Sequence, residues 1–447
     1  MATKQKLSLF DLTMIVVGLV IGMGIFRTPV VAAAKSGTAP IFFLAWAIGG
    51  LVAFCGALTY AEIGSRYPVT GGYYKVFSFA YHPSFAFAVN CIILVSNAGS
   101  IAVVGVIGAE YIGHFFFTGP TPALFKQLVT ICAVGLFYVV NMMGLTMSSR
   151  VQNLLMLFKI TLILLLLLSV FGSYPANAVT QMTTAIPAAG QNFNWLKALG
   201  TGLIAVSFCY GGYQQTINFG GDIKDPARII PRGIGYGIAI IIILYLAINA
   251  VYVKVIGFEN LKHADGIAAI LIGHLFGPVG ETILRVLMFL SVLGYVNVTL
   301  MSNPRVMFAM SEEGILPPAF KHRTKRHDAI VWSLTAFCLA IILTLVFSSA
   351  VEKIINYTIF LDSIGMSSSA ATLFIMRKRR IGEDREGIFQ MKLYPWLPII
   401  FIVSYIAIAV SIVIDDPGAA LYGGVIFACF FGLYLLSRLR KPRKGVV

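Results

Sequence analysis

Two long apolar stretches of this chain are each interrupted by glycines, and this feature limits the possible folds more than any other. The first stretch contains Gly22 and Gly24, and the second, in the other half of the chain, contains Gly211 and Gly212. A helix in lipid must satisfy its own backbone hydrogen bonds, so such interruptions are tolerated only where the backbone lines a wet cavity enclosed by protein. Glycine in a membrane helix also permits close helix packing. Its recurrence in both halves favours a pair of broken helices, which is typical of the binding site of a secondary transporter.

The composition places the chain in a membrane. Of its 447 residues, 58% are hydrophobic and 11% are charged, whereas a soluble domain carries roughly 25% charged residues. Because about 20 apolar residues cross a bilayer, hydropathy predicts about twelve transmembrane helices. The net charge of +15 is spread over short loops, which membrane topology explains better than a nucleic-acid-binding face. The sequence therefore predicts an all-α integral membrane protein.

No cofactor and no metal site are expected. All six cysteines fall inside apolar stretches and none belongs to a CxxC pair, so Cys209 is expected to be a small buried residue. The spans lack the HExxH and GxSxG motifs of enzymes, and they lack the charged rings or filter loops of a channel. An enzyme and a channel are both disfavoured.

The basic residues predict the orientation of the chain and its division into repeats. Lys and Arg concentrate in alternate loops and in the C-terminal tail, which places these loops and both termini in the cytoplasm by the positive-inside rule. The first ten spans form two sets of five, and because five is odd, the second set must cross the membrane in the opposite sense. The expected units are a first inverted repeat at 1–173, an extracellular loop at 174–195, a second repeat at 196–380, and two further helices with a basic cytoplasmic tail at 381–447. The first helix is expected to be unwound near 22–26 and the sixth near 208–214.

Broken helices supply main-chain ligands for a zwitterion. The amides of Met23 and Gly24 are expected to bind an α-carboxylate, because free N–H groups at a helix start carry partial positive charge. Carbonyls near Val20 and Ile21, and near Phe208 in the second stretch, are expected to accept from an α-ammonium group. Glycine is needed there because a side chain would keep the substrate away from the backbone.

Several ordered motifs resemble the amino acid-polyamine-organocation (APC) superfamily, and in particular a bacterial member of its L-type amino acid transporter branch. The resemblance covers essentially the whole chain and implies a twelve-helix, LeuT-like fold that carries amino acids by alternating access. The matching motifs are Gly22-Met23-Gly24-Ile25-Phe26, Tyr60-Ala61-Glu62-Ile63-Gly64, Phe208-Cys209-Tyr210-Gly211-Gly212-Tyr213-Gln214, the run from Asp225 to Arg232, Asn303-Pro304-Arg305, and the run from Glu313 to Pro317.

The resemblance implies that Phe208 is an aromatic gate over the bound substrate, although core packing would also explain an aromatic residue there. Tyr213 and Gln214 depart from the family's Trp-Asn, which changes the shape of the side-chain pocket. The expected substrate-binding residues are Val20, Ile21, Gly22, Met23, Gly24, Phe208, Cys209, Gly211, Gly212 and Gln214.

Lys159 is a lone cation near the middle of the fifth span. An unpaired charge at that depth costs several kcal/mol, and snorkelling from mid-span to an interface would require a long reach. The resemblance implies that its ammonium group occupies the place of sodium in sodium-driven relatives, touching the first helix and the eighth span. It also implies that Tyr245 forms a hydrogen bond toward the first helix, although an interface aromatic is an equal alternative.

Two further charges remain open to more than one interpretation. Arg27 directly follows the first break, where it either pairs with Glu110 or reaches the entrance of the site. Asp362 lies in the tenth span beside Ser363 and is either a proton carrier or part of a polar pocket.

The sequence thus predicts sodium-independent transport of L-amino acids, expected to be neutral, across the plasma membrane by exchange. A proton-coupled symporter is the alternative. Animal members of the L-type branch pair with a glycoprotein through a cysteine between spans three and four, but the loop at 115–121 has none. No disulfide-linked heavy subunit is therefore expected, and the partners are the substrate and the lipid bilayer.

Overall fold

The structure, a computed structural model, describes residues 6–171, 194–264, 267–346, 348–415 and 417–439. Nearly all of the expected extracellular loop at 174–195 lies outside these residues. The described first half contains the helices α1 (Leu9–Val20), η1 (Gly24–Phe26), α2 (Thr28–Ser36), α3 (Ala39–Arg66), α4 (Gly72–Ala80), α5 (Pro83–Gly113), α6 (Ala123–Met142), α7 (Leu145–Leu168) and η2 (Ser169–Phe171).

The described second half is also helical. Its elements are α9 (Trp195–Tyr210), η3 (Tyr213–Asn218), η4 (Gly220–Asp222), α10 (Pro226–Ile256), α11 (Phe258–Leu261), α12 (Ile267–Glu312), η5 (Pro318–Lys321), α13 (Val331–Val346), α14 (Ser348–Lys378), α15 (Trp396–Asp415) and α16 (Pro417–Leu439). The β-structure of the described residues consists of two isolated bridges, which join Leu7 to Ile223 and Thr70 to Phe219.

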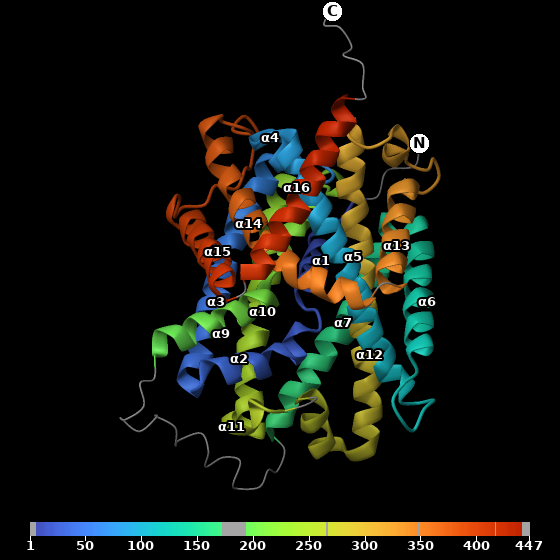
Figure 1. Cartoon of the computed structure of the whole chain (residues 1–447), viewed down its shortest axis with the longest axis vertical. Helices are drawn as coiled ribbons and strands as arrows, with labels where there is room; N and C mark the ends of the chain where they lie inside the picture. The colour runs from blue at the N-terminus through green and yellow to red at the C-terminus, as the bar shows by residue number, and fades with distance from the viewer. Residues whose placement is uncertain (1–5, 172–193, 265–266, 347, 416, 440–447) are drawn as a thin grey trace, which may run out of the picture.

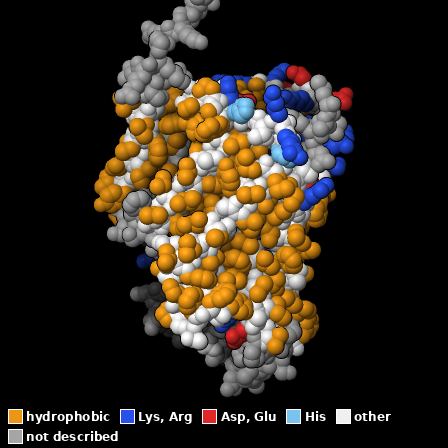
Figure 2. All heavy atoms as spheres, turned by 90° about the vertical axis from the view of Figure 1, so that its right-hand side faces the viewer, with side chains coloured by type: hydrophobic (Ala, Val, Ile, Leu, Met, Phe, Trp, Pro, Cys, Tyr) orange, Lys and Arg blue, Asp and Glu red, His pale blue; other side chains and the backbone are white. Residues whose placement is uncertain are grey.

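The protein is an all-helical, multi-pass membrane protein. Within the described residues, seven helices are long and apolar enough to cross a bilayer, namely α3, α5, α6, α7 with η2, α10, the part of α12 from Val279 to Glu312, and α15 up to Ile414. Shorter apolar helices lie within α1, α9, α13 and α16. Figure 2 shows a broad apolar flank below one end where Lys and Arg side chains gather.

Local chemistry sets where α1 and α10 begin. Ser8 and Asp11 form a capping box, in which the Ser8 hydroxyl accepts from the Asp11 amide at 3.2 Å and the Asp11 carboxylate accepts from the Ser8 amide at 2.9 Å. These bonds satisfy donors that the first turn of α1 leaves free. Pro226 opens α10, because proline fits the first position of a helix, where its missing N–H is not needed.

Both glycine-bearing stretches are interrupted. α1 ends at Val20, and the chain resumes with η1 and α2. α9 continues through Tyr210, two residues beyond Phe208, and stops at Gly211 and Gly212, after which η3 begins. The second interruption therefore starts later than the motif suggested, at the first residue without a Cβ atom.

The broken helices pack against the long ones. α1 packs on α7 and α10, while α9 packs on α2 and α3. Figure 1 shows α2 and α9 lying across the direction of the long upright helices. This arrangement brings the two interruptions to the interior of the helical bundle.

Candidate functional site

A cavity of about 280 Å³ lies between the two interruptions and helices α5, α12, α14 and α15. Most of the expected substrate-binding residues line it. Ile21 is fully buried beside it, and the side chain of Phe208 lies outside the described part of the structure. The expected residues that line the cavity are Val20, Gly22, Met23, Gly24, Cys209, Gly211, Gly212 and Gln214.

The glycines of the two interruptions play different roles. Gly212 has a φ of +113°, a backbone conformation that L side chains rarely adopt, and a Cβ atom there would meet the Leu19 carbonyl at the end of α1. A Cβ atom on Gly24 would come within 2.9 Å of the Cys209 sulfur. A Cβ atom on Gly22, in contrast, would have no neighbouring atom within 4 Å. Gly212 and Gly24 therefore permit close contact of the two breaks, while Gly22 keeps the cavity open.

Tyr245 of α10 bridges the two broken helices. Its hydroxyl lies 3.3 Å from the Val20 carbonyl oxygen and 3.3 Å from the Cys209 carbonyl oxygen, and it donates toward both. The ring is fully buried and packs edge-on against Trp46, with 5.8 Å between the ring centroids. Tyr245 thus contacts the first helix, as the resemblance implied, and α9 as well.

Lys159 of α7 is fully buried. Its Nζ donates to the Ile21 carbonyl oxygen at 2.5 Å, directly beyond the C-terminus of α1. Because the last carbonyls of a helix carry partial negative charge, they stabilise a cation at this place. A Cβ atom built on Gly294 of α12 would lie 4.0 Å from the same Nζ, so the ammonium group lies between α1, α7 and α12.

These bonds limit which carbonyls remain for a substrate. The Ile21 carbonyl accepts from Lys159, and the Val20 carbonyl accepts from the Gly22 amide at 2.8 Å and from Tyr245. A carbonyl oxygen has two lone pairs. The Ile21 oxygen therefore retains one lone pair, whereas both acceptor positions of Val20 already have donors. Because Ile21 is fully buried and does not line the cavity, a ligand would reach that lone pair only after the end of α1 shifts.

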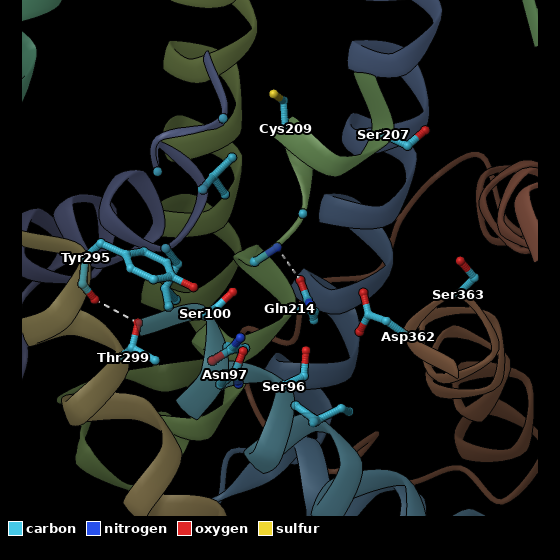
Figure 3. Close-up of a pocket in the computed structure, with 18 of the residues that line it drawn as sticks. Ser96, Asn97, Ser100, Ser207, Cys209, Gln214, Tyr295, Thr299, Asp362 and Ser363 are labelled. Atoms are coloured by element: carbon cyan, nitrogen blue, oxygen red, sulfur yellow. Dashed lines mark hydrogen bonds between the residues drawn. The ribbon is translucent and has the colours of Figure 1, made fainter. Parts of the chain in front are cut away.

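Polar side chains also line the cavity. Figure 3 shows Gln214 and Asp362 directed into the cavity, with Ser96 and Asn97 below them and Ser100 to the left of Gln214. The Gln214 side-chain oxygen accepts from the Gly212 amide at 2.9 Å. This bond fixes the Gln214 side chain against the second interruption. Tyr73 and Tyr405 interact electrostatically with Asp362.

Sequence reasoning missed several polar residues of the cavity. Ser96 and Ser100 on α5, and Tyr295 and Thr299 on α12, all line the cavity. Within each pair the residues are four positions apart, so they lie on one face of their helix. Polar residues at that spacing in an apolar span are the signal that could have identified them.

Arg27 and Glu110 do not form an ion pair in the structure. Glu110 pairs with Lys126 of α6 at 2.8 Å, and the Arg27 side chain is exposed. The sequence left two interpretations of Arg27, and the structure does not contain the pair with Glu110. A position of Arg27 at the entrance of the site stays a prediction.

Ion pairs hold together one end of the molecule, here called the charged end, which contains Glu62, Asp222, Arg305, Arg323 and Arg377. Asp222 accepts from Arg305 at 2.8 Å and lies 3.5 Å from Arg323. Burial works to raise the pKa of Asp222, but the two arginines outweigh burial and lower that pKa below its usual range.

A second group of ion pairs at the charged end is formed by Glu62 with two arginines. Its carboxylate is fully buried and pairs with Arg66 at 2.8 Å and with Arg377 at 2.7 Å. The amide of Met391 also donates to it at 3.0 Å. α3, α14 and the segment after α14 are therefore joined through one carboxylate.

Comparison with known proteins agrees with this geometry. A family model described as amino acid permease matches residues 7–435. The chain is 28% identical to the serine/threonine exchanger SteT of Bacillus subtilis (strain 168), over 92% of each chain. It is 25% identical to the human cystine/glutamate transporter, over 98% of this chain and 87% of that one. It is also 25% identical to the human large neutral amino acids transporter small subunit 2, over 98% of this chain and 81% of that one.

Proposed function

The chain belongs to the amino acid permease (APC) family, which makes it an amino acid transporter and not an enzyme, and from this premise we propose sodium-independent exchange of L-amino acids across the plasma membrane. The substrate's α-carboxylate binds at the amides of Met23 and Gly24, and its α-ammonium binds at the remaining lone pair of the Ile21 carbonyl, which a shift of the end of α1 exposes to the cavity. The relatives whose names describe exchange or amino acid transport support the reaction type.

One observation supports the proposal that transport does not require sodium. The Lys159 ammonium occupies the carbonyl end of α1, 2.5 Å from the Ile21 oxygen, where a hard cation such as sodium would need oxygen ligands. A second cation at that place would be repelled by the first. A fixed ammonium group therefore takes the structural role that a transported metal ion would otherwise have.

The remaining architecture is part of the same proposal. Twelve transmembrane helices form two inverted repeats of five, at 1–173 and 196–380, with two further helices after them. The charged end faces the cytoplasm together with both termini, because Lys and Arg gather there (Figure 2). No disulfide-linked heavy subunit is required, since the loop at 115–121 contains no cysteine.

Proton-coupled symport is the second candidate, because Asp362 places a carboxylate at the cavity wall. A carboxylate that gains and loses a proton during the cycle could couple uptake to a pH gradient. Exchange needs an amino acid on both sides of the membrane, whereas symport needs only the gradient.

The test uses the full chain in liposomes and follows uptake of labelled amino acids. Uptake that requires internal amino acid, and that persists when choline replaces sodium, supports the proposal. Collapse of uptake in choline would contradict sodium independence. Uptake into empty liposomes driven by an inward proton gradient would favour symport instead.

A further inference from the structure

Asp362 is a carboxylate of the cavity that recognition of the α-amino acid group leaves unused. It lies on α14, half-buried, and lines the cavity together with Ser363, Tyr405 and Gln214. Figure 3 shows its carboxylate directed into the cavity, toward Gln214.

Asp362 differs from the two carboxylates buried at the charged end. Glu62 has Arg66 and Arg377 as partners, and Asp222 has Arg305 and Arg323. Among the side chains that the structure describes, no Lys or Arg forms an ion pair with Asp362, and its electrostatic neighbours are phenols. Because a carboxylate inside a membrane protein is costly unless a cation accompanies it or it takes up a proton, this wall can accept a cation from outside the chain.

Lys159 does not supply that cation, because its Nζ is held by the Ile21 carbonyl. The cavity also contains apolar surface near the carboxylate. Ile92 and Ile93 of α5 line both the cavity and an adjoining apolar pocket against Leu361 of α14. An aliphatic stem that ends in a positive charge would find both features along this wall.

We propose that Asp362 is the counter-ion of a subsite for the cationic side chain of a basic L-amino acid, such as lysine or ornithine. The methylene stem lies against Ile92 and Ile93, and the terminal ammonium pairs with the carboxylate. This assignment rests on the proposed function, and it replaces the sequence-based expectation of a neutral substrate with a basic one.

The test compares binding of L-lysine and L-norleucine to the purified full chain. The two ligands share an aliphatic stem of the same length, and only lysine carries the terminal ammonium group. We expect lysine to bind roughly 10- to 100-fold more tightly, as is usual for a close charge pair. Asp362→Asn should remove this preference by weakening lysine binding alone. Glu281→Gln removes one negative charge at an exposed ion pair outside the cavity and should leave the preference intact.

Retained norleucine binding in Asp362→Asn shows that the variant is folded, so a lost lysine preference then supports the subsite. Equal weakening of both ligands overturns it, because Asp362 would then bind the α-ammonium group. An unchanged preference overturns it as well, and so does a wild-type protein that favours norleucine. If the wild type binds neither these nor any other amino acid, the proposed function itself fails.

Discussion

At the residue scale, the two interruptions depend on glycine for two separate physical reasons. Gly212 combines a φ of +113° with a close approach to the Leu19 carbonyl, so a side chain there would strain the backbone and force α1 and η3 apart. Gly22 faces open space, so a side chain there would enter the cavity without disturbing its neighbours. One glycine thus supports the fold of the site, and the other leaves space in the cavity.

Alanine substitutions separate these two roles. Gly212→Ala should lower the melting temperature and destabilise the protein by about 1–3 kcal/mol, because strained backbone conformations cost that much. Gly22→Ala should leave the melting temperature unchanged and weaken amino acid binding, because its methyl group occupies cavity space. Thermal unfolding and ligand-binding titrations check both.

Gly235 offers a matched control for these variants. It lies inside α10, and a Cβ atom added there would have no atom within 4 Å, so Gly235→Ala should raise stability by about 0.5–1 kcal/mol through helix propensity. If Gly22→Ala binds amino acids as well as the wild type, the backbone around Gly22 does not contact the substrate.

The sequence predicts some of these residues much better than others. Gly22, Gly212 and Lys159 stand out because each violates the local rules of an apolar helix. The expected pair of Arg27 with Glu110 does not form, because Lys126 approaches Glu110 from α6, which local sequence does not reveal.

At the element scale, Tyr245 couples the ends of α1 and α9. One hydroxyl donates toward the Val20 and Cys209 carbonyls, which the helix ends leave without a full set of intrahelical partners. The two broken helices therefore share a donor from α10, and a movement of either end changes the bonding of the other.

Removing this hydroxyl should cost stability and slow exchange. Tyr245→Phe leaves two buried carbonyls with fewer donors, and we expect a loss of about 1 kcal/mol together with a lower counterflow rate. Tyr252→Phe is the matched control on the same helix, because the buried Tyr252 hydroxyl has no hydrogen-bond partner among the described residues. Its removal should be neutral or stabilising. Equal effects of the two variants would contradict the coupling role of Tyr245.

The existence of the helices follows from hydropathy, but their ends do not. The glycine motif suggested an interruption from Phe208, whereas α9 continues to Tyr210. Phe208, Cys209 and Tyr210 keep helical geometry, and the helix ends directly before Gly211 and Gly212. A match to the motif does not tell which of its residues is the last one in the helix.

At the scale of the whole molecule, the charged end ties together segments that are distant in the chain. Asp222 joins η4 to Arg305 of α12 and to Arg323 after η5, and Glu62 joins α3 to Arg377 of α14. Alternating access requires that one end of the site open while the other closes. These ion pairs join helices at the charged end, so an opening that separates those helices would have to break them.

The lowered pKa of Asp222 predicts how the stabilisation from its ion pairs depends on pH. Because the folded-state pKa is lowered, the stabilisation is present above the usual aspartate pKa and is lost as pH falls through the lowered value. Asp222→Asn should therefore cost about 3 kcal/mol at pH 7. Thermal unfolding of both proteins over a pH series should show this difference narrowing only below about pH 4. A difference that already disappears between pH 7 and 5 would contradict the assignment.

Cryo-electron microscopy of the protein with a transported amino acid bound would locate the substrate's two charged groups. We expect the ligand's α-carboxylate at the amides of Met23 and Gly24 and its α-ammonium within hydrogen-bond distance of the Ile21 carbonyl, with Lys159 still on that carbonyl. A ligand bound elsewhere in the bundle, with no main-chain contact at either interruption, would refute substrate recognition by the broken helices.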